Sequence, residues 1–364
     1  MNKIFLLYLV VFFHSFSVFS QTNDSTELNT IESQFSDSIA LINEQNECLK
    51  NSRDAYNAGL LLLEDKSFID AVASFTNAIT IDSTFSDAYL SRAKCYEGSD
   101  NKLAISDYLK AFELDSSNFS ALYLLAALQF QSDKELAKQT YNTIISLNDT
   151  EYMAFSQLGV IAFLAKDYQQ SEQFFTQSLA INTNAYTLND RGSCYRKLEQ
   201  FDAAIQDYLA AIDLNTDLAF VYSNLASVYA KQGGTEKALR YYDLAIKRDA
   251  NYALAYNNKA SLLLENKEYE KAESAIEKAL VADSICAPAF NNRGVLNHQY
   301  KRYKDAITDF DKAIKLDDNY AKAYLNRGIS KQMARDDDGA CLDWNRAKEL
   351  GIIMAKKYLA NDCE

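Results

Sequence analysis

Small residues recur along the chain at an almost constant interval. Nine of them are separated by 33 or 34 positions: Gly59, Ala93, Ala126, Gly159, Gly192, Ala226, Ala260, Gly294 and Gly328. Eleven or twelve positions after each comes a second small residue, and four positions further comes an aromatic residue or isoleucine, as in Phe75, Phe310 and Trp344. The regular interval identifies nine copies of one unit, which together cover residues 52–350.

The composition of the 364-residue chain favours helix in these copies. The chain contains one proline and ten glycines, and Ala, Leu, Lys, Glu and Gln are plentiful. Because Gly and Pro mark turns and loops, so few of them argue against a β-rich or loop-rich fold. A content of 48% hydrophobic residues is enough to bury a large core. We therefore predict an all-α protein.

The repeated pattern of small and aromatic residues resembles the tetratricopeptide repeat, a helix–turn–helix unit of about 34 residues. The resemblance extends over nearly the whole chain after residue 51, and nine copies in register make it specific. It implies an α-solenoid, a right-handed superhelix in which the first helix of each unit, helix A, lines a concave groove. One departure from the family is that Ser83, Ser116, Thr216 and Asp318 replace its proline at the junctions. Residues of these types can cap the next helix instead.

The segments that flank the repeats predict three further parts. Residues 1–20 are typical of a secretory signal peptide, with Lys3, an apolar run and Ser20 before the cleavage site. The alternative, a membrane anchor, needs about 20 apolar residues, so the mature chain is expected to have no transmembrane segment. Residues 21–51 predict a flexible polar leader that ends in a short helix at 37–51, and residues 351–364 predict a C-terminal capping helix.

Arginine and aspartate occur together in four copies. The arginine precedes the first small residue and the aspartate precedes the aromatic residue of the same copy, in the pairs Arg92 and Asp107, Arg191 and Asp207, Arg293 and Asp309, and Arg327 and Asp343. The other five copies have neither residue at these positions. We therefore interpret each pair as an ion pair between the two helices of one copy. The alternative is a cluster of arginines that binds acidic ligands.

Asparagine forms a second row along the repeats. Asn224, Asn258, Asn292 and Asn326 are 34 positions apart, and Asp190 takes the equivalent place one copy earlier. The row resembles the asparagine ladder of tetratricopeptide superhelices that hold a peptide backbone, and an amide offers both a donor and an acceptor for that purpose. These five residues are therefore candidates for partner binding. The alternative is that each one only bonds the neighbouring helix.

The N-terminal copies carry apolar residues on the corresponding helices. Tyr123, Phe130 and Phe163 are the candidates that we place in the groove. Exposed apolar patches of this kind tend to mark partner sites. The alternative is that these side chains belong to the core between the helices.

Charge and histidine content exclude several kinds of chemistry. The formal net charge is −13 and basic runs are absent, which argues against nucleic acid as a partner. Apart from His14 in the predicted signal peptide, His298 is the single histidine, so histidine-based catalytic triads and common zinc sites have too few ligands. The sequence contains no phosphate-binding loop and no nucleophile elbow. We expect no cofactor, no metal and no catalytic residue.

Two of the six cysteines predict a disulfide. Cys341 and Cys363 lie 10 and 12 positions on either side of Gly351, a predicted turn, so an antiparallel hairpin would bring them level. The alternative is two free thiols, because a disulfide requires a Cα separation of about 4.4–6.8 Å. Cys95 and Cys194 occupy the same place in two copies and are expected in the core.

These observations predict a scaffold for protein–protein interaction. The protein would be exported to the periplasm or the extracellular space, bind a peptide or protein partner in the groove, and have no enzymatic activity of its own. One alternative is a non-catalytic regulatory or assembly subunit of a cell-envelope enzyme or transport complex. A weaker alternative is a hydrolase whose motifs are not recognised.

Overall fold

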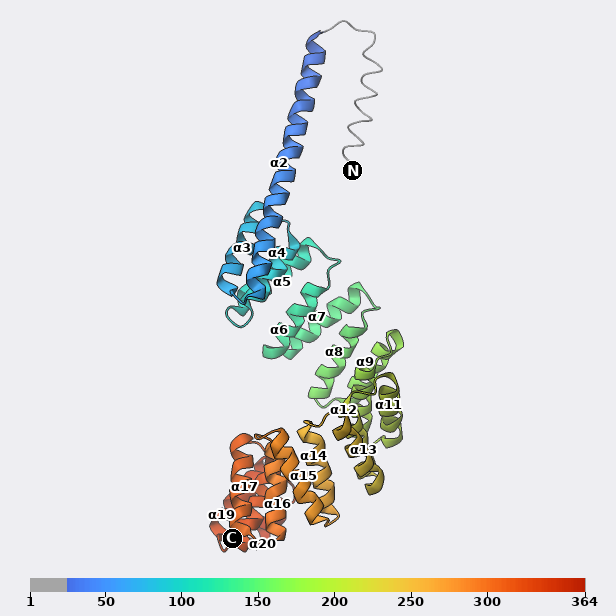
Figure 1. Cartoon of the computed structure of the whole chain (residues 1–364), viewed down its shortest axis with the longest axis vertical. Coiled ribbons are helices and arrows are strands. Elements are labelled where there is room, and N and C mark those ends of the chain that lie inside the picture. Colours follow the sequence, from blue (N-terminus) through green and yellow to red (C-terminus); the bar gives the residue numbers. More distant parts are fainter. Residues whose placement is uncertain (1–24, 364) are drawn as a thin grey trace. The chain divides into compact units, whose positions relative to one another are not determined.

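The computed structural model describes residues 25–363, with side chains from residue 33 onwards, and the predicted signal peptide lies outside them. Every element in these residues is a helix (Figure 1). The even-numbered helices α2 to α18 are the A helices, and the odd-numbered helices α3 to α19 are the B helices that follow them. The prediction of an all-α protein made of nine helix pairs and a terminal helix is therefore confirmed. No helix in residues 25–363 combines the length and the apolar character needed to cross a membrane.

The described residues divide into two compact units, one up to residue 140 and one from residue 141 onwards, called unit 1 and unit 2 below. The division falls within α7 (Lys134–Leu147). The preceding helices of unit 1 are α2 (Ser25–Glu64), α3 (Phe68–Ile81), α4 (Ser86–Tyr96), α5 (Asn101–Leu114) and α6 (Ser120–Ser132). In this unit α2 packs on α3, and α4 packs on α5.

Helix α2 is longer than the sequence pattern predicted. It runs from Ser25 to Glu64 without a break, whereas we expected a flexible leader, a short helix at 37–51 and then the first repeat helix. Residues 25–58 contain neither Gly nor Pro, so no residue in this stretch interrupts the backbone hydrogen bonds of the helix. The C-terminal part of α2 is the first A helix, and its N-terminal part extends beyond the other helices of unit 1 (Figure 1).

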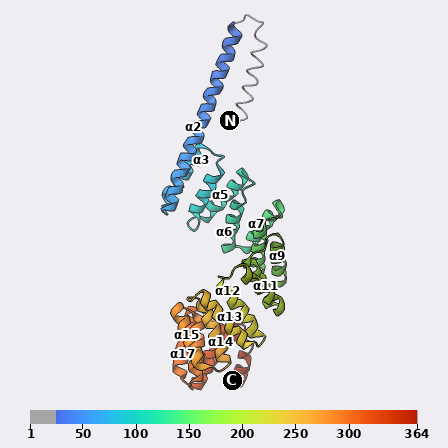
Figure 2. The ribbon, with the colours of Figure 1, turned by 45° about the vertical axis from the view of Figure 1, so that its right-hand side comes forward.

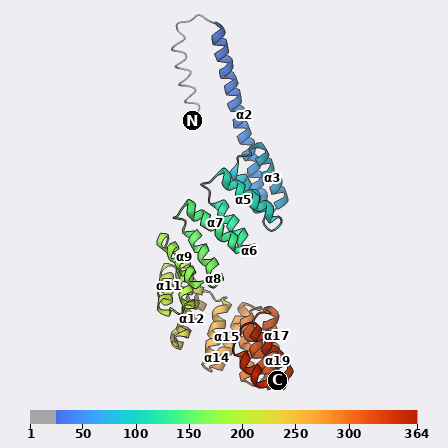
Figure 3. The same ribbon diagram turned by 180° about the vertical axis from the view of Figure 1, so that it is seen from behind.

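Unit 2 continues the alternation of A and B helices, and Figures 2 and 3 show these helices from two further sides. Neighbouring A helices touch one another directly as well as through the B helices between them. The pairs are α8 (Tyr152–Leu164) and α9 (Tyr168–Ile181), α10 (Ala185–Lys197) and α11 (Phe201–Leu214), α12 (Ala219–Lys231) and α13 (Thr235–Arg248), α14 (Ala253–Glu265) and α15 (Tyr269–Ala282), α16 (Ala287–Gln299) and α17 (Tyr303–Leu316), and α18 (Ala321–Met333) and α19 (Asp337–Glu349). The terminal helix is α20 (Ala355–Asp362).

Aromatic side chains of the B helices pack over the small residues of the A helices. A Cβ atom added to Gly294 would lie 2.6 Å from the Phe310 ring, and one added to Gly328 would lie 2.5 Å from the indole of Trp344. These distances are too short for any side chain, so the close approach of the two helices requires glycine there. The repeated small and aromatic residues therefore form a close contact between the two helices of a pair.

Candidate partner-binding face

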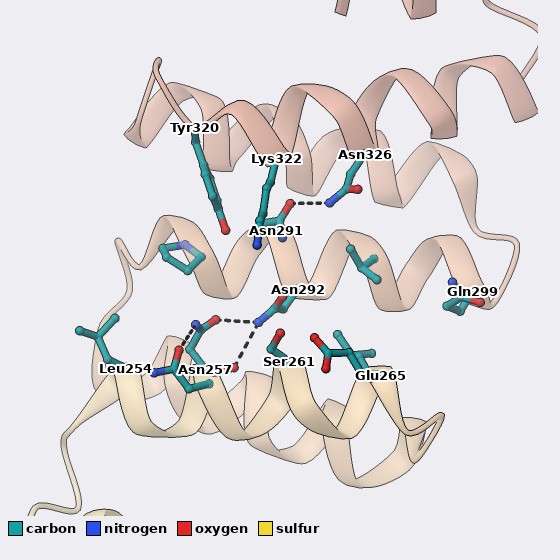
Figure 4. A pocket seen from close by; sticks show the side chains of 14 residues that line it. Leu254, Asn257, Ser261, Glu265, Asn291, Asn292, Gln299, Tyr320, Lys322 and Asn326 are labelled. Atoms are coloured by element: carbon teal, nitrogen blue, oxygen red, sulfur yellow. Dashed lines mark hydrogen bonds between the residues drawn. The ribbon is translucent and has the colours of Figure 1, made fainter. Parts of the chain in front are cut away.

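A pocket of about 540 Å³ lies on three neighbouring A helices, α14, α16 and α18 (Figure 4). Amide side chains occupy its centre, while Glu265 and Lys322 supply one negative and one positive charge. The lining comprises Leu254, Asn257, Asn258, Ser261, Leu264, Glu265, Pro288, Asn291, Asn292, Val295, Gln299, Tyr320, Lys322 and Asn326. Three residues of the predicted asparagine row therefore lie in one pocket.

Three of the four predicted asparagines also bridge neighbouring A helices. The Nδ2 group of Asn292 donates to Oδ1 of Asn257 at 2.8 Å and to its backbone oxygen at 3.2 Å. Asn326 donates in the same way to Oδ1 of Asn291 at 3.0 Å, as the dashed lines in Figure 4 show. Asn224 donates to Oδ1 of Asn189 at 2.9 Å. Each of these three amide nitrogens thus holds the preceding A helix, as the alternative reading of the row proposed.

The acceptors of these bonds form a second asparagine row that our sequence analysis missed. Asn189, Asn257 and Asn291 are buried, and each precedes a member of the predicted row by one position. The 34-residue interval between Asn257 and Asn291 would have revealed this second row. Asn257 donates in turn to Oδ1 of Asn258 at 3.2 Å.

The orientation of the Asn292 amide leaves its oxygen available to a ligand. A backbone carbonyl is one of the two groups that Asn292 contacts on α14, and a carbonyl can only accept, so the nitrogen must point there. Within residues 33–363, Oδ1 of Asn292 accepts no hydrogen bond. One side chain can therefore hold the neighbouring helix through its nitrogen and accept a ligand N–H through its oxygen.

Asp190, Asn224 and Phe163 line a second pocket, of about 310 Å³, on α8, α10 and α12. Burial raises the pKa of Asp190 to about 6, although a hydrogen bond from Asn189 partly opposes the rise. Arg196 lines the same pocket, and its buried Nε has no hydrogen-bond partner among the residues that the structure describes. This pocket therefore combines apolar walls with a carboxyl group, an amide and a guanidinium group.

The other two apolar candidates belong to unit 1. Tyr123 and Phe130 are both half-buried on α6, and the ammonium group of Lys134 lies 5.6 Å from the centroid of the Phe130 ring. Phe163, in unit 2, packs edge-to-face on Tyr168 with 5.2 Å between the ring centroids. Of the three, Phe163 is the one that lines a described pocket.

All four predicted Arg–Asp pairs are bidentate contacts between the A and B helices of one repeat. Nε and Nη2 of each arginine donate to the two carboxylate oxygens of its aspartate, at distances from 2.5 to 3.0 Å. The hydrogen bond to Asp207 is the main cause of a raised pKa for Arg191. Because the donor edge of each guanidinium group is occupied, the geometry favours the structural role over an arginine cluster for ligands.

Cys341 and Cys363 form a disulfide with 5.8 Å between their Cα atoms. Gly351 makes the turn between the two arms with a φ of +95°, a conformation that suits glycine. Tyr358 of α20 stacks on Trp344 of α19, with ring centroids 4.9 Å apart, so the terminal helix covers the last B helix. Cys95 and Cys194 are buried in the core.

The described side chains include no group arranged as a metal site. Between residues 33 and 363, no three His, Cys, Asp or Glu side chains are placed to hold a metal ion. His298 lies on α16, where Nδ1 is 2.9 Å from the Ser330 hydroxyl oxygen and burial lowers the pKa of the imidazole.

Family comparisons agree with the repeat pattern. Family profiles described as "TPR repeat" and "Tetratricopeptide repeat" match residues 192–233, 223–288 and 287–320. No curated protein matches the chain. Among solved structures, a chain of the "APC/C hetero-tetramer Cut9-Hcn1" has a TM-score of 0.58 and 14% identity, over 86% of this chain and 76% of the other.

A second solved structure, that of MamA, covers 45% of this chain and 96% of its own length. Its identity of 22% and TM-score of 0.37 are too low to support an argument about this protein. The Cut9-Hcn1 match extends the agreement in fold beyond the segment that the profiles match. With its nine helix pairs and the three profile matches, the chain is a member of the tetratricopeptide-repeat family.

Proposed function

We propose that this protein is an exported, non-catalytic scaffold that binds a peptide or protein segment on the A face of unit 2. The A face is the surface of α8, α10, α12, α14, α16 and α18 that carries the two pockets. The observation that supports this proposal best concerns Asn292, which lines a pocket of about 540 Å³. Its side-chain oxygen accepts no hydrogen bond from residues 33–363. Ligand sites commonly have volumes of about 300–1,000 Å³.

The properties of the A face suit a polypeptide better than the other ligand classes. Amides offer donors and acceptors that match a peptide backbone whatever its sequence. The formal net charge of −13 repels polyanions, which disfavours nucleic acid. The family also serves mainly in protein–protein contacts, and its members include the chain that resembles this one in the Cut9-Hcn1 hetero-tetramer.

Two features support export. Residues 1–20 have the charge, apolar run and small residue of a secretory signal. The disulfide between Cys341 and Cys363 suits an oxidising compartment, since thiols stay reduced in the cytosol.

The test is capture of partners from the cell envelope of the native host by the mature protein, followed by mass spectrometry. Asn258→Ala is the informative variant, because Asn258 lines the pocket and accepts a hydrogen bond from Asn257 of its own helix. Asn345→Ala, at an exposed position on the B helix α19, is the matched control. We expect a partner that Asn345→Ala retains and Asn258→Ala loses. Equal capture by both variants would contradict binding at the A face.

A further inference from the structure

The N-terminal part of α2 carries a row of mainly apolar residues along one side. Five residues follow one another at alternating intervals of four and three, which keeps them on the same side of a helix: Phe35, Ile39, Ile42, Asn46 and Leu49. Phe35, Ile39 and Leu49 are exposed, at 38%, 42% and 46% of their full accessible surface. We call these five residues the α2 seam.

The contacts of α2 with α3 lie on another side of the helix. The Cys48 thiol and the Ser52 hydroxyl donate to backbone oxygens of α3, at 3.3 and 3.0 Å. Leu49 follows Cys48 by one residue and therefore points about 100° away from this side. The neighbouring A helix α4 begins at Ser86, 34 positions after Ser52, so the α2 seam lies N-terminal to the turns of α2 that α4 packs beside. Figure 1 shows this part of α2 extending beyond α3 and α4.

The spacing of the α2 seam is that of a two-stranded coiled coil. In a heptad abcdefg, the core positions a and d follow one another at intervals of three and four. Ile39 and Asn46 take a, whereas Phe35, Ile42 and Leu49 take d. A β-branched residue at a with leucine at d favours two strands, and a single asparagine at a fixes the register of the two chains. The α2 seam therefore suits a second helix with the same pattern.

The charges beside the α2 seam allow that second helix to be another copy of this chain. Between residues 33 and 52, the acidic residues take only the outer positions b and f: Asp37, Glu44 and Glu47. Positions e and g, which flank the core of a coiled coil, hold Lys50 and otherwise neutral polar residues. Two copies thus bring no acidic groups together. A basic partner helix would need acidic residues at e and g, where charges select the partner.

We propose that two copies of this protein associate through the α2 seam as a parallel, in-register pair of helices. The Asn46 amides of the two copies face each other, and each can both donate and accept. Glu32 and Arg53 take the a positions before and after the seam, so the contact is limited to residues 35–49, about 21 Å of helix. So short a contact forms a dimer that dissociates on dilution. The dimer offers two A faces to one partner, which increases avidity.

Sedimentation equilibrium of the mature chain, residues 21–364, tests the dimer over about 1–300 μM. Ile39→Lys places a charge in the seam of both copies and should weaken association by at least about tenfold. The matched control is Ala40→Lys, which adds the same charge at the exposed outer position b and should leave association unchanged. Circular dichroism verifies that both variants fold, as expected because both positions are exposed in the single chain.

Disulfide cross-linking tests the orientation of the two helices. Cys48→Ser first removes the free thiol that lies within this stretch of α2. In that background Ile42→Cys should cross-link two copies under mild oxidation, because equivalent d positions meet in a parallel pair. Ala40→Cys in the same background is the control and should not cross-link, because position b points away from the second copy.

Three results would overturn the inference. A monomer at every concentration would exclude the dimer, and a dimer that Ile39→Lys leaves intact would form through another surface. Loss of the dimer in Ile39→Lys without a cross-link in Ile42→Cys would exclude the parallel, in-register pair. None of these results concerns the A face, so the proposed function is tested separately, by capture with Asn258→Ala.

Discussion

Asp190→Asn should stabilise the protein at neutral pH. Asp190 takes the place of an asparagine in the predicted row, and burial raises its pKa from the ordinary 3.8 to about 6. The folded state binds the Asp190 proton more tightly than the unfolded state does, so protonation of Asp190 stabilises the fold. This stabilisation is complete below pH 3.8 and is lost as the pH rises through about 6. At 1.36 kcal/mol for each pKa unit, the buried carboxylate costs up to about 3 kcal/mol above pH 7. Partial solvent access reduces this figure, so we expect about 1–3 kcal/mol.

An asparagine would remove this cost without removing the local contact. Its Oδ1 can still accept the hydrogen bond that Asn189 donates at 3.1 Å. The amide is neutral at every pH, so the gain should appear between about pH 4 and pH 7 and be small at the acidic end. The matched control is Asp217→Asn, an exposed aspartate in the turn before α12, which should change stability by less than about 0.5 kcal/mol.

The assay is urea unfolding of both variants and the parent chain across this pH range, followed by circular dichroism and tyrosine fluorescence. Two probes are needed because repeat arrays can unfold in parts. A gain for Asp190→Asn that is the same at pH 4 and pH 7.5 would refute the reasoning, because it would not come from titration of a buried carboxyl group. A loss of stability at pH 7.5 would refute it as well.

Three further predictions concern the other contacts of the chain. Arg293→Leu should lower the free energy of unfolding by about 2–3 kcal/mol, which is less than the usual loss for a buried pair because the arginine side chain is 36% exposed. Adding Asp309→Thr should recover much of this loss. A double-mutant cycle that shows no coupling would contradict the ion pair. Asn292→Ala should cost about 1–2 kcal/mol through its two bonds to α14, whereas Asn258→Ala should leave the urea midpoint almost unchanged. Cys341→Ser should cost about 2–4 kcal/mol under oxidising conditions, and a reducing agent should then lower the melting temperature of the parent chain but not of the variant.

The repeat interval made much of this structure predictable. A helix pair is a local unit, so its small residues, its aromatic residue and its Arg–Asp partners all lie within about one repeat of each other in the sequence. Nine copies also act as internal comparisons, which showed that arginine and aspartate occur together. The same local geometry led from Gly351 to the pairing of Cys341 with Cys363. The unbroken helix α2 could also have been predicted, since residues 25–58 contain neither Gly nor Pro.

Contacts between repeats could not be predicted from the sequence, because they depend on how one A helix packs against the next. The interval located Asn292, but only the packing of α14 against α16 decided that its nitrogen reaches Asn257 and that its oxygen accepts no hydrogen bond from the described side chains. Asp190, whose pKa burial raises, likewise shares its pocket with residues of α8 and α12, and the distance of these helices from α10 is not a property of any single repeat. The sequence by itself thus determined the repeats and the pairs within them. The tertiary structure decided which of their polar groups face one another and which face a ligand.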